Sequence, residues 1–161
     1  MSEKNTEKEM IEYTSYCTSI VARLQREEVK KGYRARARNL YELMTYSGIP
    51  LSLAYIFAKS SEELLFKCYE RLLEDYEKRT DISEAVKGVE DILRASGDEN
   101  ASYALYGASI VFTLSKLIAK KFSSMDELVL HYSFDKLIRR RILEIAKWLK
   151  LFAEAKLPTG R

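Results

Sequence analysis

Apolar and basic residues separate onto two sides of a helix in residues 134–156, where the hydrophobic pattern of the chain is clearest. At about 100° per residue, the apolar side is made of Ile138, Ile142, Ile145, Trp148, Leu149 and Phe152. The opposite side is basic and is made of Lys136, Arg139, Arg140, Lys147 and Lys150. Leu143 and Leu151 project among the basic residues. The pattern predicts a helix from Phe134 to Lys156 that buries one stripe and presents the other.

Capping residues and apolar spacing divide the rest of the chain into further helices. Thr6 and Glu9 have the spacing of a capping box, which predicts a helix from about residue 7. Its apolar stripe ends in charged residues before Gly32. A second helix is predicted from Tyr33 to a C-terminal cap at Gly48.

Three shorter helices follow in the predicted order. Pro50 suits the first turn of a helix that runs to about residue 59. Ser61 can cap the next helix, unless the chain continues from the third helix with only a kink. Asp81 and Glu84 form another capping box and open a helix that ends near Gly97. Residues 97–100 are expected to form a loop.

Residues 101–122 are apolar on two sides, which is typical of a helix in the middle of a bundle. The alternative is that the second side contacts another subunit. Ser124 can cap a short helix over residues 126–132, and Ser133 can cap the last helix. Without strand-like alternation, the chain is predicted to be all-α. We expect one helical bundle of about six to seven helices over residues 1–161, with short disordered ends at about 1–6 and 157–161.

The composition agrees with a single globular domain, since 47% of the 161 residues are hydrophobic and 32% are charged. The net charge of +3 is slight, so any contact with nucleic acid must depend on local clustering. Cys17 and Cys68 lie in apolar stripes, which favours buried free thiols over a disulfide. The uncharged stretches are shorter than the roughly 20 residues of a membrane helix, and no signal peptide is evident. We expect a cytoplasmic protein without membrane contact.

Sequence signatures of catalysis are not found. With one histidine, His131, the chain cannot form a histidine-rich metal site, and Glu127 with His131 is best interpreted as a helix-stabilising pair. There is no glycine-rich phosphate loop and no nucleophile elbow. The carboxylates of Glu74, Asp75 and Glu77 are interpreted as a solvated face. We expect a protein that is not an enzyme and has no cofactor and no metal.

A second basic face accompanies the predicted helix from Tyr33 and the residues before it. It is made of Lys30, Lys31, Arg34 and Arg38, with Arg36 turned away. Arginines one helical turn apart match the spacing of phosphates, and each planar guanidinium can hold two oxygens. Together with the basic side of residues 136–150, these residues are the candidate RNA-binding set. The alternative for both faces is an ordinary solvated surface.

Two segments resemble a known family. The first is residues 33–59, YRARARNLYELMTYSGIPLSLAYIFAK, and the second is residues 145–155, IAKWLKLFAEA. Both are similar to the small α-helical subunit of the type III-B CRISPR effector complex, called the Cmr complex. Residues 61–100 look longer than the middle of that family. Leu40 and Tyr41 stand where a Leu-Pro is common, and a tyrosine there should let the second helix continue without a break.

The resemblance implies a non-catalytic subunit that stacks on itself and on other subunits along the path of guide and target RNA. In this hypothesis the basic faces neutralise the RNA backbone, and exposed Leu143 and Leu151 contact other subunits. An acidic helix over residues 62–77 could meet the basic face of the next copy, head to tail. The alternative hypothesis is a free-standing helical dimer that binds duplex nucleic acid as a regulator. A third is an enzyme that acts on nucleotides.

Overall fold

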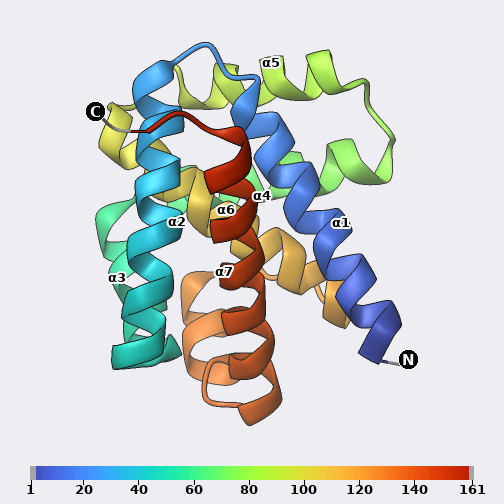
Figure 1. Ribbon diagram of the computed structural model, residues 1–161, viewed down its shortest axis with the longest axis vertical. Coiled ribbons are helices and arrows are strands. Elements are labelled where there is room, and N and C mark those ends of the chain that lie inside the picture. The colour runs from blue at the N-terminus through green and yellow to red at the C-terminus, as the bar shows by residue number, and fades with distance from the viewer. Residues whose placement is uncertain (1–2, 160–161) are drawn as a thin grey trace.

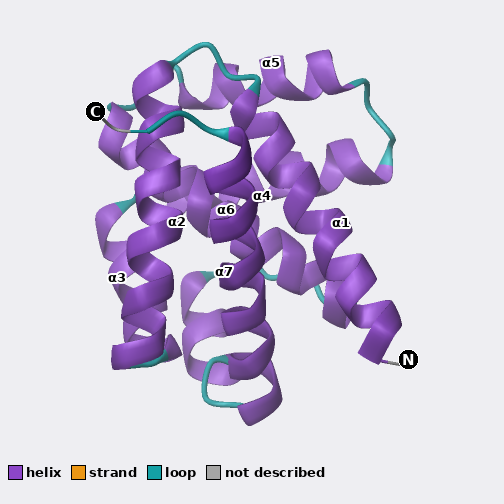
Figure 2. Ribbon diagram, viewed as in Figure 1, coloured by secondary structure: helices purple, strands orange, loops and turns teal. Residues whose placement is uncertain are grey.

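The structure, a computed structural model, describes residues 3–159, and every regular element in this range is helical (Figure 2). Seven α-helices and one π-helix follow each other along the chain: α1 (Glu3–Ala22), α2 (Glu27–Ser47), α3 (Ile49–Lys59), α4 (Glu62–Glu77), α5 (Ile82–Leu93), α6 (Asp98–Ile118), η1 (Glu127–Tyr132) and α7 (Lys136–Lys156). The prediction of an all-α bundle is confirmed.

Helix α6 is the centre of the bundle and packs against α1, α2, α3, α4 and α7 (Figure 1). Every residue from 101 to 115 is buried. By length and composition α6 could cross a membrane, but 83% of its apolar window is buried inside the protein, as in the core helix of a globular bundle. The two apolar sides predicted for this segment are therefore both used within the subunit.

Two glycines allow neighbouring helices to approach α6 closely. A Cβ atom at Gly107 of α6 would lie 2.3 Å from Leu65 Cδ1 of α4. A Cβ atom at Gly32 of α2 would lie 2.8 Å from the Cβ of Ser102. Real Cβ atoms do not come so close to other atoms, so the packing of α2 and α4 on α6 depends on these glycines.

An aromatic cluster joins α1 and α4 to α6. The rings of Tyr13, Tyr16 and Tyr76 surround Phe112, with centroids 5.6–6.0 Å from that ring. Most of these pairs meet edge to face, the arrangement that the ring quadrupole favours. The cluster therefore fixes α1 and α4 on α6.

Several helix boundaries agree with the capping residues in the sequence. Gly48 has φ +87°, a conformation that only glycine adopts without strain. Its amide donates a hydrogen bond to the Met44 carbonyl at the end of α2. The Ser61 hydroxyl accepts a hydrogen bond from the Leu64 amide at 2.9 Å, and so separates α3 from α4. Asp81 caps α5, and Ser124 accepts from the amide of Glu127 at the start of η1.

The first break in the chain was predicted at the wrong place. Helix α1 already includes residues 3–6, so Thr6 lies inside it and does not cap it. Of the ends that were predicted to be disordered, residues 1–2 and 160–161 lie outside the described range. Residues 23–26 form the turn, and α2 begins before Gly32. The turn is held by Arg26, which donates to the carbonyls of Leu93 and Ser96 at 2.9 and 2.8 Å.

Other boundaries also differ from the sequence prediction. Residues 98–100 are helical, because Gly97 is the N-cap of α6 and Asp98 pairs with Arg26 at 2.6 Å. Helix α6 ends at Ile118, not near residue 122, with Ala119 in the left-handed conformation. The cap of α7 is Asp135, whose carboxylate accepts from the Ile138 amide at 3.0 Å, whereas Ser133 is buried and bonds to the Val129 carbonyl. Helix α2 continues through Leu40 and Tyr41 without a break, as expected.

Candidate nucleic-acid interface

Helices α2 and α7 lie side by side and run in opposite directions (Figure 1). Two contacts fix their register. The guanidinium of Arg34 donates to the carbonyls of Glu154 and Leu157 at 3.2 and 2.7 Å, at the C-terminal end of α7. Two turns further along α2, the ammonium of Lys150 lies 5.4 Å from the ring centroid of Tyr41. The two predicted basic faces therefore belong to neighbouring helices.

Four of the predicted RNA-binding cations are exposed and form no ion pair or side-chain hydrogen bond within residues 3–159: Arg38, Lys136, Arg139 and Lys147. Arg140 is also exposed, and its pair with Glu144, at 3.4 Å, is one that a phosphate could replace. Three of these five cations, Arg139, Arg140 and Lys147, lie on the outer side of α7. We call this set of five the α2–α7 basic surface.

The remaining predicted cations are engaged within the protein. Lys30 is 13% exposed, pairs with Glu27 at 2.9 Å and donates to the Ala22 carbonyl. Lys31 lies 3.5 Å from the carboxylate of Glu28, and Lys150 lies over Tyr41. The guanidinium of Arg34 caps the carbonyls that α7 leaves unpaired at its end. These contacts stabilise the fold.

Helix α7 differs from its predicted pattern at its two flanks. Ile138, Ile142, Ile145, Leu149 and Ala153 are buried, as expected. Trp148 and Phe152, which were predicted to be core, are only half-buried, and their rings stack with centroids 5.9 Å apart. Leu143, which was predicted to be exposed, packs against the core, whereas Leu151 is 44% exposed. Compared with the prediction, the buried stripe of α7 is therefore narrower on the flank of Trp148 and Phe152 and wider on the flank of Leu143.

Lys156 anchors the end of α7 on α1, which the sequence did not indicate. Its ammonium lies 4.8 Å from the ring centroid of Phe152 and donates to the hydroxyls of Ser15 and Ser19 at 2.9 and 3.0 Å. Desolvation of the ammonium by α1 lowers the pKa of Lys156, although the rest of its side chain is exposed. Trp148, Phe152 and Lys156 thus form one ladder at i, i+4 and i+8.

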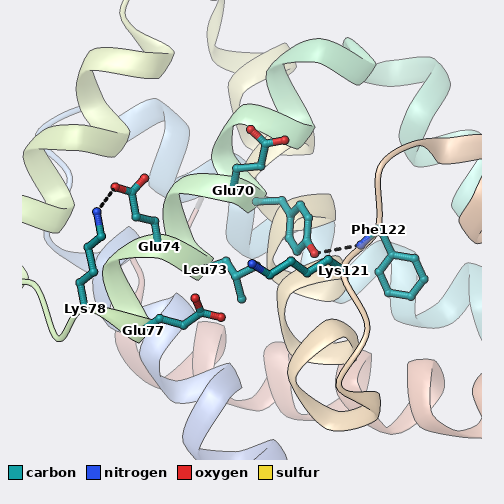
Figure 3. A pocket seen from close by; sticks show the side chains of 8 residues that line it. Glu70, Leu73, Glu74, Glu77, Lys78, Lys121 and Phe122 are labelled. Atoms are coloured by element: carbon teal, nitrogen blue, oxygen red, sulfur yellow. Dashed lines mark hydrogen bonds and ion pairs between the residues drawn. The ribbon is translucent and has the colours of Figure 1, made fainter.

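The acidic side of α4 lies away from the α2–α7 basic surface. Helix α4 packs on α5 and α6, whereas α2 and α7 pack on each other. Glu70, Glu74 and Glu77 surround an open cavity of about 340 Å³ (Figure 3). Glu74 pairs with Lys78 at 2.8 Å, which lowers the pKa of Glu74, and Lys121 extends toward α4 from the segment after α6.

Asp75 was predicted to belong to a solvated face with Glu74 and Glu77, and for Asp75 this prediction is wrong. Its side chain is 4% exposed, and its carboxylate accepts a hydrogen bond from Nε of Arg71 at 2.8 Å. Tyr69, which also lines the cavity beside α4, is buried, and its hydroxyl accepts from the Phe122 amide at 3.1 Å and donates to Ser115.

Within the described residues, the side chains that could act in catalysis or bind a metal are not brought together. Cys17 and Cys68 are free and buried, as predicted, and burial raises the pKa of each thiol to about 12. His131 is exposed on the π-helix η1, and no hydrogen bond or ion pair joins it to Glu127 in the described range. Among residues 3–159, no group of three metal-ligating side chains comes together.

Comparisons with known proteins give one match. Neither the comparison with curated proteins nor the comparison with solved structures finds a similar chain. A family model described as CRISPR-associated protein (Cas_Cmr5) matches residues 7–156, which include all of α2 and α7 and all the cations of the α2–α7 basic surface. The chain belongs to this family and is a small subunit of the type III-B CRISPR-associated Cmr complex.

Proposed function

We propose that this chain is a non-catalytic structural subunit that stacks along the type III-B ribonucleoprotein and lines the path of guide and target RNA with its α2–α7 basic surface. The observation that supports the proposal most directly is the side-by-side packing of α2 and α7, two helices that each carry exposed cations, such as Arg38 and Lys147. Cations that are exposed and unpaired within the described residues can bind phosphates without first breaking internal contacts.

The proposed binding is independent of base sequence at this surface. The cations are exposed on α2 and α7, two helices that pack side by side. Phosphate contacts position a nucleic acid without reading it. Each copy makes a few such contacts, so high affinity is expected only when several copies act on one RNA strand.

Stacking is proposed to use opposite charges on separate sides of the subunit. Because α4 and α7 do not pack on each other, the acidic side of α4 cannot meet the α2–α7 basic surface of its own copy. Contact between the two in successive copies is heterologous, and it propagates as a row instead of closing as a dimer. Exchanging Glu70 and Glu77 for lysine should then reduce the number of copies per assembled complex, measured by native mass spectrometry.

Charge reversal on α7 tests the RNA role. A variant with Arg139→Glu, Arg140→Glu and Lys147→Glu should keep its fold but bind RNA more weakly. Log affinity falls with log salt concentration, and losing three phosphate contacts should make that fall less steep, by about 2 in the slope for single-stranded RNA.

The matched control carries Lys67→Glu, Lys87→Glu and Arg94→Glu, which are exposed residues of the α4–α5 side. Both variants reverse three cations and so have the same net charge. If the two variants bind RNA equally, or if the α7 variant keeps the wild-type salt slope, the phosphate role is wrong. If the α7 variant fails to assemble, its circular dichroism spectrum tells loss of fold from loss of a subunit contact.

A further inference from the structure

A second concave site lies on the opposite flank of α2, between α2, α3 and α6. It is a cavity of about 440 Å³, within the range of about 300–1000 Å³ for small-ligand pockets. Arg36 and Leu43 of α2, Leu51 and Tyr55 of α3 and Tyr103 of α6 form its walls, and Asn39 lies at its edge. Arg36 is the only formally charged residue in this lining.

The guanidinium of Arg36 lies over an aromatic ring and has a buried donor without a partner. The carbon of its guanidinium lies 4.3 Å from the ring centroid of Tyr103, a stacked cation–π geometry. Its Nε atom is buried and has no hydrogen-bond partner among the described residues. Buried donors without a partner are uncommon, because each loses its hydration without compensation. The Arg36 guanidinium forms no hydrogen bond within the described residues, so its donors remain available to a bound ligand.

The other walls of the pocket are formed by aromatic rings and leucine side chains. The rings of Tyr55 and Tyr103 meet at 66° with centroids 6.1 Å apart, and Tyr55 remains 39% exposed. The ammonium of Lys59 lies 5.6 Å from the Tyr55 centroid, so a second cation borders the same ring. Leu51 is 59% exposed beside it. An accessible ring with cations around it is the arrangement on which unpaired bases stack.

We propose that this pocket binds one unpaired base of an RNA strand. The base stacks between Tyr55 and the leucine side chains, and a base carbonyl accepts a hydrogen bond from the Arg36 guanidinium. The side-chain amide of Asn39 has no partner in the described range and can bond to the edge of the base. Arg36 and the nearby Lys59 make this side of the pocket positive, which suits a polyanion. This inference rests on the proposed RNA role.

The test compares two probes that differ only in their bases. A labelled single-stranded oligouridylate and an abasic strand of the same length are titrated with the full chain, and fluorescence anisotropy gives both dissociation constants. We expect the base-bearing strand to bind roughly 5- to 100-fold more tightly. Tyr55→Leu should remove most of that preference without weakening the abasic strand. Tyr46→Leu, at a ring that is 87% exposed and outside the pocket lining, should change neither.

The outcomes separate the base pocket from the phosphate surface. Equal binding of the two strands, or a preference that survives Tyr55→Leu, overturns the pocket. The triple charge reversal on α7 should weaken both strands equally and leave the preference intact; if it changes nothing, the proposed phosphate surface fails instead.

If neither strand binds measurably, uridine monophosphate is titrated while the NMR signals of Leu51 and Tyr55 are followed. Shifts of these signals support the base pocket, and their absence overturns it. Shifts that occur only on addition of the other complex subunits, without RNA, would assign the pocket to protein docking and also overturn it.

Discussion

Replacing Arg71 by leucine is expected to destabilise the fold, because the carboxylate of Asp75 would lose the cation with which it is paired. The Asp75 side chain is 4% exposed and Arg71 is 35% exposed, and Nε lies 2.8 Å from Oδ2. Water can therefore solvate the cation of this pair but hardly the anion. The side chain of Arg71 also covers Gly88, where a Cβ atom would lie 2.5 Å from its Cζ.

The expected loss follows from the burial of the anion. Removing one partner of a fully buried pair costs about 3–5 kcal/mol. Because Arg71 is partly solvated, we expect a decrease of about 2–3 kcal/mol in the free energy of unfolding. For a chain of this size that corresponds to a decrease of about 4–12 °C in Tm.

Urea denaturation followed by circular dichroism measures the loss, with Lys78→Leu as the control. Lys78 and Glu74 are also four residues apart at the end of α4 and lie 2.8 Å apart, but both are exposed, so their pair should contribute little to stability. Adding Asp75→Asn to Arg71→Leu removes the unpaired charge and should restore part of the stability. Equal losses for the Arg71 and Lys78 variants, or no recovery in the double variant, would refute the buried-charge argument.

Three further predictions test local features of the fold by chemical denaturation. Gly48→Ser should cost about 1 kcal/mol, because φ is +87°, whereas Gly97→Ser, at an N-cap, should be neutral or stabilising. Asp135→Ala should lower the free energy of unfolding by about 1 kcal/mol, because the cap of α7 is lost. Asp135→Asn keeps a capping oxygen and should retain the wild-type stability. Burial raises the pKa of Cys17 and Cys68 from 9.0 to about 12, so the native state keeps protons that the unfolded state releases. Stability should therefore fall as the pH rises from 9.0 to about 12, and replacing both cysteines by alanine should flatten that decline.

Helix boundaries set by local chemistry could be predicted from the sequence. Gly48 supplies a backbone conformation that other residues resist, and the hydroxyl of Ser61 reaches an amide three residues away. The turn before α2 could not be predicted in this way. It depends on Arg26 reaching carbonyls some 70 residues further along the chain, and no local pattern encodes such a contact. Gly32 therefore looked like a break, although its role is the close packing of α2 on α6.

The roles of the basic residues also depend on contacts between distant parts of the chain, and not on local sequence alone. Periodicity placed Arg34 and Arg38 on one face, one helical turn apart, and so treated them as equivalent. In the structure Arg34 lies at the C-terminal end of α7, where unpaired carbonyls accept its hydrogen bonds, and Arg38 lies exposed. The register of α2 against α7 decides which arginine stabilises the fold and which remains available for phosphate. A sequence pattern contains the period of each helix but not the register between two helices. Reversing the charge of Arg38 therefore tests RNA binding, whereas the same change at Arg34 tests the packing of α7.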